Sequence, residues 1–214
     1  MRGVFITFEG PEGSGKTTQA RRLAAFLEAQ GYAVVLTREP GGTLIGDQIR
    51  RILLDHANEA MQPRTEVLLF QASRAQHVDE LIRPALAAGK IVLCDRFADS
   101  TLAYQGYGRG EDLAELQRLI AYATGGLKPD LTFLLDIEPE KGLMRRRGRP
   151  LLPEWNRLDA ETLAFHHKVR QGYRKMAAAE PERWVTISAD RPPEAIQAEI
   201  RAVVRRVLPP PPST

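Results

Sequence analysis

The sequence has few of the features expected of a secreted or membrane-bound protein. Its single cysteine, Cys94, excludes a disulfide within the chain and agrees with a reducing compartment. No apolar run approaches the ~18 residues that a membrane-spanning helix needs. The opening run MRGVFITFEG predicts a buried strand and lacks the longer apolar stretch and cleavage site of a signal peptide. We therefore expect a cytoplasmic protein with no membrane partner.

The chain also lacks an excess of charge of either sign. Its 30 Lys and Arg residues and 27 Asp and Glu residues give a formal net charge of only +3. This balance does not call for a nucleic-acid partner, and we expect none. The histidines do not have metal-ligand spacing with cysteine or acidic residues, which argues against a histidine-based metal centre; they are His56, His77, His166 and His167.

Short apolar runs alternate with helical patterns along the chain. Continuous apolar runs are typical of strands buried on both faces, and their alternation with helices predicts right-handed crossovers and a parallel sheet. Strands are expected at 3–9, 32–37, 90–95, 130–137 and 184–188. Helices are expected at 17–30, 43–55, 64–88 with a bend near Pro84, and 192–207. The predicted fold is α/β, a three-layer α/β/α sandwich around a five-stranded parallel sheet.

The predicted domain organisation is simple. The 214 residues suit one domain, and the sequence contains neither an internal repeat nor a long linker. We assign residues 1–208 to this domain and expect a disordered tail at 209–214. Charge, glycine and proline interrupt the helical pattern at 145–156, which we expect to be a mobile lid.

The strongest local signal is GPEGSGKT, which matches the phosphate-loop pattern G-x-x-x-x-G-K-[ST] between a predicted strand and a predicted helix. Backbone N–H groups and the helix N-terminus attract phosphate there. Lys16 would reach the β- and γ-phosphates, and the Thr17 hydroxyl would help to hold Mg²⁺. A glycine-rich turn that matches by chance is the alternative. The expected ATP-binding residues here are Gly10, Pro11, Glu12, Gly13, Ser14, Gly15, Lys16, Thr17 and Thr18.

A second set of polar groups separates the classes of phosphate-loop protein. The sequence lacks the Asn/Thr-Lys-x-Asp motif with which GTPase switches read their base. Asp95 and Arg96 follow a predicted strand, at the edge where parallel sheets bind ligands. Asp95 can organise Mg²⁺ or its water, and Arg96 can bind a phosphate. A purely structural Asp–Arg ion pair is the alternative.

Several motifs occur in an order that resembles one known family. The segments FEGPEGSGKTT, TREPGGT, LLFQASRAQH, DRFADSTLAYQG, an arginine-rich stretch and NRLDAETLAFHHKVRQGY together resemble the bacterial thymidylate kinases of the P-loop nucleoside monophosphate kinase superfamily. The resemblance covers nearly the whole chain. It implies transfer of a phosphoryl group from ATP to dTMP with Mg²⁺, for dTTP supply, by a homodimer. Another P-loop kinase with a different acceptor, or a non-catalytic module that contacts nucleic acid through its basic lid, is the alternative.

The resemblance also implies an acceptor pocket. Phe70 would stack on thymine, and Arg74, one helical turn later, would donate to thymine O4. Glu12, a carboxylate within an anion-binding loop, would accept from the deoxyribose 3′-hydroxyl, and Tyr104 would crowd the 2′ position. A core Phe70, a solvated Arg74 and a solvent-facing Glu12 are the alternatives. The implied dTMP-binding residues are Glu12, Arg38, Pro40, Phe70, Arg74, Arg96, Ser100, Thr101, Tyr104 and Gln105.

An arginine must also neutralise charge on the transferred phosphoryl group. The variable positions of the phosphate loop contain none, so the resemblance implies the type of thymidylate kinase whose catalytic arginine lies in the lid. Arg149 and Arg157 are the leading candidates, followed by Arg145 and Arg146. The predicted catalytic residues are Lys16, Asp95, Arg96, Arg149 and Arg157; Ala189 and Asp190 are expected near adenine, and Thr17 and Asp95 near Mg²⁺.

Overall fold

The computed structural model describes residues 2–147, 156–208 and 210. Its five parallel strands lie in the order β2-β3-β1-β4-β5. Their bounds are β1 Phe5–Glu9, β2 Val34–Arg38, β3 Ile91–Asp95, β4 Leu131–Asp136 and β5 Trp184–Ser188. All five predicted strands are confirmed, with ends displaced by two residues or fewer. Residues 148–155 of the expected lid, and 209 and 211–214 of the expected tail, lie outside the described residues, so lid and tail remain predictions.

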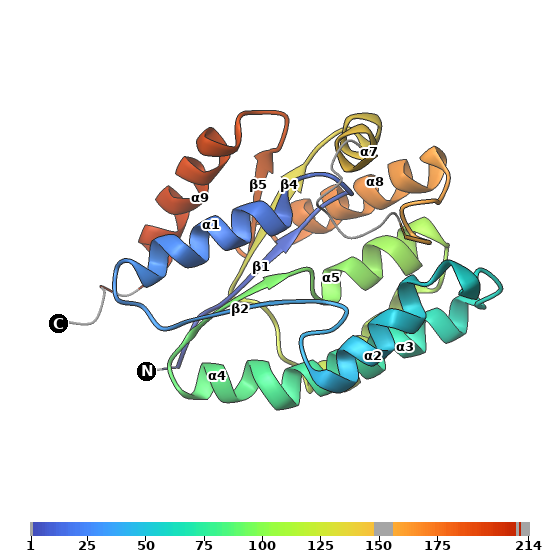
Figure 1. Ribbon diagram of the computed structural model, residues 1–214, viewed down its shortest axis with the longest axis horizontal. Coiled ribbons are helices and arrows are strands. Elements are labelled where there is room, and N and C mark those ends of the chain that lie inside the picture. The colour runs from blue at the N-terminus through green and yellow to red at the C-terminus, as the bar shows by residue number, and fades with distance from the viewer. Residues whose placement is uncertain (1, 148–155, 209, 211–214) are drawn as a thin grey trace.

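Helices fill the connections between the strands (Figure 1). Their bounds are α1 Lys16–Glu28, α2 Leu44–Leu54, α3 Pro63–His77, α4 Arg83–Ala87, α5 Ala98–Thr101, α6 Leu113–Thr124, α7 Pro139–Arg147, α8 Leu163–Ala179 and α9 Pro193–Val207. The shorter elements are a 3₁₀ turn η1 at His56–Asn58 and π-helical turns η2 at Val78–Ile82 and η3 at Leu102–Gly108. The expected long helix at 64–88 is therefore α3, η2 and α4 in succession. Its irregular turn precedes Pro84, which lacks the N–H needed to continue the α-helical ladder.

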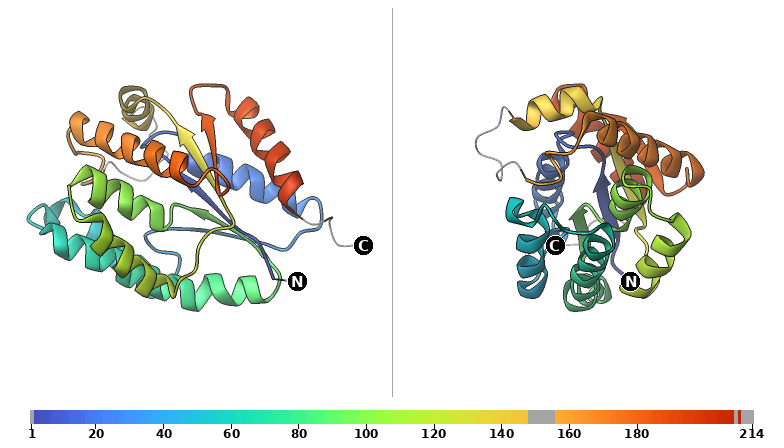
Figure 2. Two further views of the ribbon diagram at one scale, coloured as in Figure 1. Left: turned by 180° about the vertical axis from the view of Figure 1, so that it is seen from behind. Right: turned by 90° about the vertical axis from the view of Figure 1, so that its right-hand side faces the viewer.

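The sheet lies between two layers of helices, as predicted. Helices α1 and α9 cover one face of the sheet, and helices α4, α5 and α8 lie on the other (Figures 1 and 2). Ile6 and Phe8 of β1 pack with α1 and α9, whereas Phe5 packs against Val78 and Ile82 on the opposite face. The central strands are thus buried on both sides, which explains their continuous apolar sequences. Within the described residues, no helix combines the length and apolar character needed to cross a membrane.

Candidate active site

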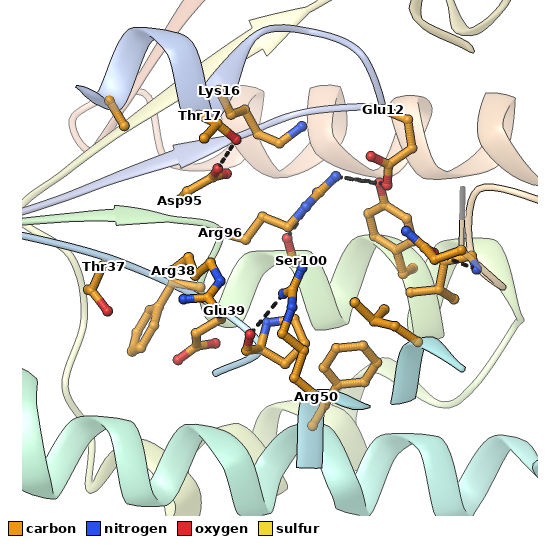
Figure 3. A pocket seen from close by; sticks show the side chains of 18 of the residues that line it. Glu12, Lys16, Thr17, Thr37, Arg38, Glu39, Arg50, Asp95, Arg96 and Ser100 are labelled. Carbon is orange, nitrogen blue, oxygen red and sulfur yellow. Dashed lines mark hydrogen bonds and ion pairs between the residues drawn. The ribbon is translucent and has the colours of Figure 1, made fainter. Parts of the chain in front are cut away.

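A cavity of about 910 Å³ opens beyond the carboxyl ends of β1, β2 and β3. Its lining comes from the phosphate loop, the loop after β2, helices α2 and α3, the end of β3, the last residues of α5 and the end of α7. Figure 3 shows Lys16 and Thr17 on one side of this cavity and Arg38 and Arg50 on the other, with Arg96 between them. The parallel topology explains this convergence, because loops far apart in sequence meet at one edge of the sheet.

The phosphate loop has the geometry expected of an anion cradle. Gly13 adopts a left-handed φ of 67°, and a Cβ atom there would lie 1.9 Å from the carbonyl oxygen of Gly142, so only glycine fits. The Lys16 ammonium donates to the carbonyl oxygens of Gly10 at 3.0 Å and Pro11 at 2.7 Å. Burial lowers the pKa of Lys16 to about 8. The loop and its lysine thus form a compact, positively charged rim at the start of α1.

Thr17 and Asp95 form the candidate magnesium site. The Thr17 hydroxyl donates a hydrogen bond to the Asp95 carboxylate, which joins the first turn of α1 to the end of β3 (Figure 3). A hydroxyl and a carboxylate are hard oxygen ligands of the kind that Mg²⁺ prefers. Both residues also line the cavity beside Lys16. The donor set therefore fits a magnesium ion bound together with nucleotide phosphates.

Arg96 joins the phosphate loop to the other side of the cavity. Its Nη2 donates to Glu12 at 2.9 Å and to the Tyr104 hydroxyl at 3.0 Å, and its Nη1 donates to the Gly10 carbonyl oxygen at 3.1 Å. Tyr104 also donates to Glu12 at 2.7 Å. Burial opposes ionisation of Glu12, but Arg96 and then Lys16 outweigh it and lower the Glu12 pKa to about 2. Glu12 is thus an ionised carboxylate turned towards Arg96, and the solvent-facing alternative is wrong.

The residues expected to form the base pocket lie on α3 and at the end of α5. Phe70 and Arg74 both line the cavity, one helical turn apart. Arg74 is only 1% exposed, and it donates to Glu39 at 2.9 Å and to the Thr101 hydroxyl at 3.0 Å. The alternative of a solvated Arg74 is therefore wrong. Glu39 is buried as well and fixes the direction of the guanidinium group.

Other expected acceptor residues line the same cavity in varied surroundings. Arg38 is about half exposed and pairs with Asp47 at 3.0 Å. Gln105 also lines the cavity, and its amide donates to the buried Glu66 at 2.8 Å. The structure also brings the remaining acceptor candidates to this cavity: Pro40, Ser100 and Thr101.

The comparisons with known proteins agree with this geometry. A sequence model of the thymidylate kinase family matches residues 8–200. The chain belongs to the thymidylate kinase family. A thymidylate kinase of Roseiflexus castenholzii is 57% identical, over 96% of this chain and 94% of that protein. One from Deinococcus radiodurans is 54% identical, over 95% and 97%. The crystal structure of an Ehrlichia chaffeensis thymidylate kinase superimposes with a TM-score of 0.77 at 36% identity, over 95% and 99% of the two chains.

The candidate lid arginines of this thymidylate kinase occupy different surroundings. Arg145 and Arg146, at the end of α7, line the cavity. Arg157 is 8% exposed and donates to the Leu53 carbonyl oxygen and to Glu66, and it is absent from the lining. Among the described residues the structure thus brings Arg145 and Arg146, but not Arg157, to the cavity lining. Arg149 lies outside the described residues.

The two residues expected near adenine lie close to α7. Arg145 donates to the Ala189 carbonyl oxygen at 2.8 Å and to Asp190 at 3.1 Å, and Lys141 also pairs with Asp190. Neither Ala189 nor Asp190 lines the cavity. Thr18, by contrast, lines it beside the phosphate loop. Ala189 and Asp190 therefore contact α7 and do not line the cavity.

Sequence reasoning missed Arg50. This residue of α2 lines the cavity and donates to the Pro40 carbonyl oxygen at 2.9 Å. Burial, and then the charge of Arg38, lowers its pKa. The helical pattern of 43–55 was visible, but which face meets the cavity depends on the loop between β2 and α2. A basic residue on the helix that follows TREPGGT was the available signal.

Proposed function

We propose that this thymidylate kinase transfers the γ-phosphoryl group of ATP to dTMP with the help of Mg²⁺, producing ADP and dTDP. The observation that carries the proposal is the bridge from Arg96 to Glu12. It joins a phosphate loop, which suits a triphosphate, to a second set of cations and an aromatic side chain within the same cavity. Such an arrangement suits a reaction between two nucleotides rather than simple hydrolysis.

The donor side consists of the phosphate loop, Lys16, Thr17 and Asp95. Backbone N–H groups and Lys16 bind the β- and γ-phosphates of ATP and orient the γ-phosphorus towards the acceptor. Thr17 and Asp95 would hold Mg²⁺, which supplies positive charge to phosphate oxygens. The proposal is supported by the direct contact of Thr17 with Asp95 and by the burial of Lys16.

The acceptor side consists of three arginines and the base pocket. Arg38, Arg50 and Arg96 supply positive charge for the dTMP phosphate, and the planar guanidinium groups suit paired phosphate oxygens. A phosphate oxygen is anionic at neutral pH, so it attacks the γ-phosphorus without a strong general base. Phe70 stacks on thymine, and Arg74 donates to thymine O4. The place of Arg74 in the cavity lining, one helical turn from Phe70, supports this role. Its Nη groups donate to Gln71, Thr101 and the Phe97 carbonyl oxygen, so thymine O4 would share or replace one of these acceptors.

The sugar of dTMP is assigned to Glu12 and Tyr104. Glu12 accepts from the 3′-hydroxyl, and the Tyr104 ring occupies the space that a 2′-hydroxyl would need. Their mutual hydrogen bond supports this pairing, because it holds both groups on the acceptor side of the phosphate loop. Ser100, Thr101 and Gln105 complete the proposed pocket.

The catalytic lid arginine is assigned to the end of α7 or the segment that follows it. We favour Arg145 and Arg146 over Arg157, because both line the cavity and Arg157 does not. In the structure Arg145 pairs with Asp190 and Arg146 with Asp159, so either would exchange its carboxylate partner for the phosphoryl group. Arg149 remains a candidate from the resemblance alone. An arginine at this point stabilises the charge that spreads over the transferred phosphoryl group.

We further propose a homodimer that works in the cytoplasm, where ATP and nucleoside monophosphates are abundant. Large apolar side chains exposed on α2 and α3 support self-association, since such surfaces commonly mark contacts; they are Leu44, Ile45, Ile52 and Leu68. Light scattering coupled to gel filtration tests the dimer, and a mass near the 23.9 kDa of one chain would contradict it.

An ADP-release assay with and without dTMP tests the proposed function. The wild-type enzyme should release ADP with Mg²⁺ and dTMP together and hardly at all when either is omitted. Lys16→Ala is the matched control, and it should lower the rate by a factor on the order of 10²–10³ or more. Salt-sensitive DNA binding without dTMP-dependent ADP release would instead indicate a nucleotide-binding module that contacts nucleic acid.

A further inference from the structure

Arg96 has an unusual backbone conformation. Its φ is 70°, and it is the one non-glycine residue with positive φ among those that the structure describes. The left-handed region is unfavourable for residues with a Cβ atom, so surrounding contacts must hold Arg96 there. Such conformations cluster at sites where a side chain needs a particular direction. The contacts that hold Arg96 are therefore informative about the site.

The end of β1 holds the backbone of Arg96 and of the residue that follows it. Glu9 is the last residue of β1 and is fully buried. Its Oε1 accepts the backbone N–H of Phe97 at 2.7 Å, directly after Arg96. The backbone N–H of Arg96 itself donates to the Phe8 carbonyl oxygen at 3.0 Å, directly before Glu9. The end of β1 thus fixes the turn that follows β3.

The Glu9 carboxylate also orients the Arg96 guanidinium group, through the hydroxyls of Ser100 and Tyr173. Glu9 Oε2 accepts from the hydroxyls of Ser100 at 2.7 Å and Tyr173 at 2.8 Å. Arg96 Nη1 in turn donates to the oxygens of Ser100 at 3.3 Å and Tyr173 at 3.1 Å. Each hydroxyl has one hydrogen. When both hydrogens point to Glu9, both oxygens present lone pairs to Arg96.

We propose that Glu9 and Tyr173 are positioning residues that fix the backbone turn and guanidinium direction of Arg96 for the acceptor phosphate. The inference rests on the proposed function, because it takes the acceptor phosphate to bind at Arg96. Tyr173 lies on α8, and its ring is fully buried. Glu9 and Tyr173 are both absent from the cavity lining, so they would act on the acceptor phosphate only through Arg96.

Two near-isosteric substitutions test the proposal. Tyr173→Phe removes the hydroxyl and keeps the buried ring, and Glu9→Gln replaces one carboxylate oxygen by a donor that opposes Arg96. Tyr107→Phe is the matched control, since Tyr107 packs against Gly172 of the same helix and is absent from the cavity lining. Each test variant should raise KM for dTMP, by about tenfold for Glu9→Gln, and leave KM for ATP within about twofold. The control should leave both constants unchanged.

Crystal structures of both test variants add a measurement that does not depend on turnover. We expect Arg96 to lose its left-handed φ in Glu9→Gln and its guanidinium direction in Tyr173→Phe. An unchanged Arg96 in both variants, or equal rises of KM for ATP and dTMP, would overturn the positioning role. Absence of dTMP-dependent ADP release in the wild-type enzyme would refute the proposed function instead, and the position of Arg96 in the variants would still decide this inference.

Discussion

The hydroxyl of Thr17 donates to the carboxylate of Asp95, which links the first turn of α1 to the end of β3. This contact joins the threonine that follows the phosphate-loop lysine to the acidic residue at the end of the neighbouring strand. Their oxygens are the donors that this site offers to Mg²⁺. The contact therefore gives a direct way to test the metal dependence of the reaction.

Asp95→Asn should weaken the use of Mg²⁺ more than the binding of dTMP. The amide keeps the shape of the side chain but loses the charge that attracts the cation. We expect the Mg²⁺ concentration for half-maximal rate to rise by on the order of tenfold or more. A magnesium titration of the ADP-release rate measures this, and EDTA should abolish the wild-type rate. Unchanged magnesium dependence in the variant would remove Asp95 from the metal site.

Phe70→Ala should raise KM for dTMP by about tenfold, because stacking of a base on an aromatic ring contributes ~1–3 kcal/mol. KM for ATP serves as the internal control, since Phe70 belongs to α3, whereas the expected ATP-binding residues belong to the phosphate loop and the start of α1. Initial rates with each substrate varied in turn give both constants. A larger effect on ATP than on dTMP would exclude Phe70 from the thymine site.

Arg157→Ala should lower the free energy of unfolding and leave kcat largely unchanged. Arg157 and Glu66 are 8% and 1% exposed, and Glu66 keeps Arg109 as a second partner, so the loss of the charge-assisted hydrogen bonds of Arg157 should cost ~1.5–3 kcal/mol. Urea unfolding of the variant should show this loss, whereas kcat of the folded enzyme should stay within about tenfold of the wild type. Arg145→Ala is the comparison: the Arg145 side chain is 37% exposed, and its loss should cost little stability. A fall of kcat by about a thousandfold in Arg157→Ala, with unchanged stability, would restore Arg157 as the catalytic lid arginine.

These residues also mark what the sequence could and could not predict. The sheet, the phosphate loop and the order of motifs followed from local patterns, because apolar runs and glycine spacing are contained within a few residues. The surroundings of Arg157 could not be predicted from local patterns, because its partner Glu66 is 91 residues away and the two meet only in the folded chain. Arg50 was missed for the same reason, and the left-handed conformation of Arg96 has no signal in its residue type.

Glu9 should make the stability of the enzyme depend on pH. Burial, followed by the charge of Asp99, raises the Glu9 pKa from 4.5 to about 7. The folded enzyme then holds a proton that the unfolded chain has released, so this group lowers stability as pH rises through that window. Glu9→Gln removes the effect. The difference in Tm, variant minus wild type, should therefore increase from about pH 5 to about pH 8.

Thermal unfolding of both proteins across this pH range measures the difference. Altered hydrogen bonding in Glu9→Gln shifts Tm by the same amount at every pH, whereas titration of Glu9 makes the difference in Tm change with pH. A difference in Tm that stays constant with pH, or that decreases as pH rises, would contradict the raised pKa of Glu9.

Acceptor specificity is the sharpest test of the proposed transfer to dTMP. The ratio kcat/KM should be measured with fixed ATP and Mg²⁺ for dTMP, dUMP, dCMP and thymidine. We predict that dTMP gives the highest value. dUMP should follow with a modest deficit, because one methyl group contributes only on the order of 1 kcal/mol. dCMP and thymidine should be poor, since one presents an amine to Arg74 and the other lacks the phosphate that Arg96 would bind. A higher kcat/KM for dCMP or thymidine than for dTMP would contradict the assignment of dTMP as the acceptor.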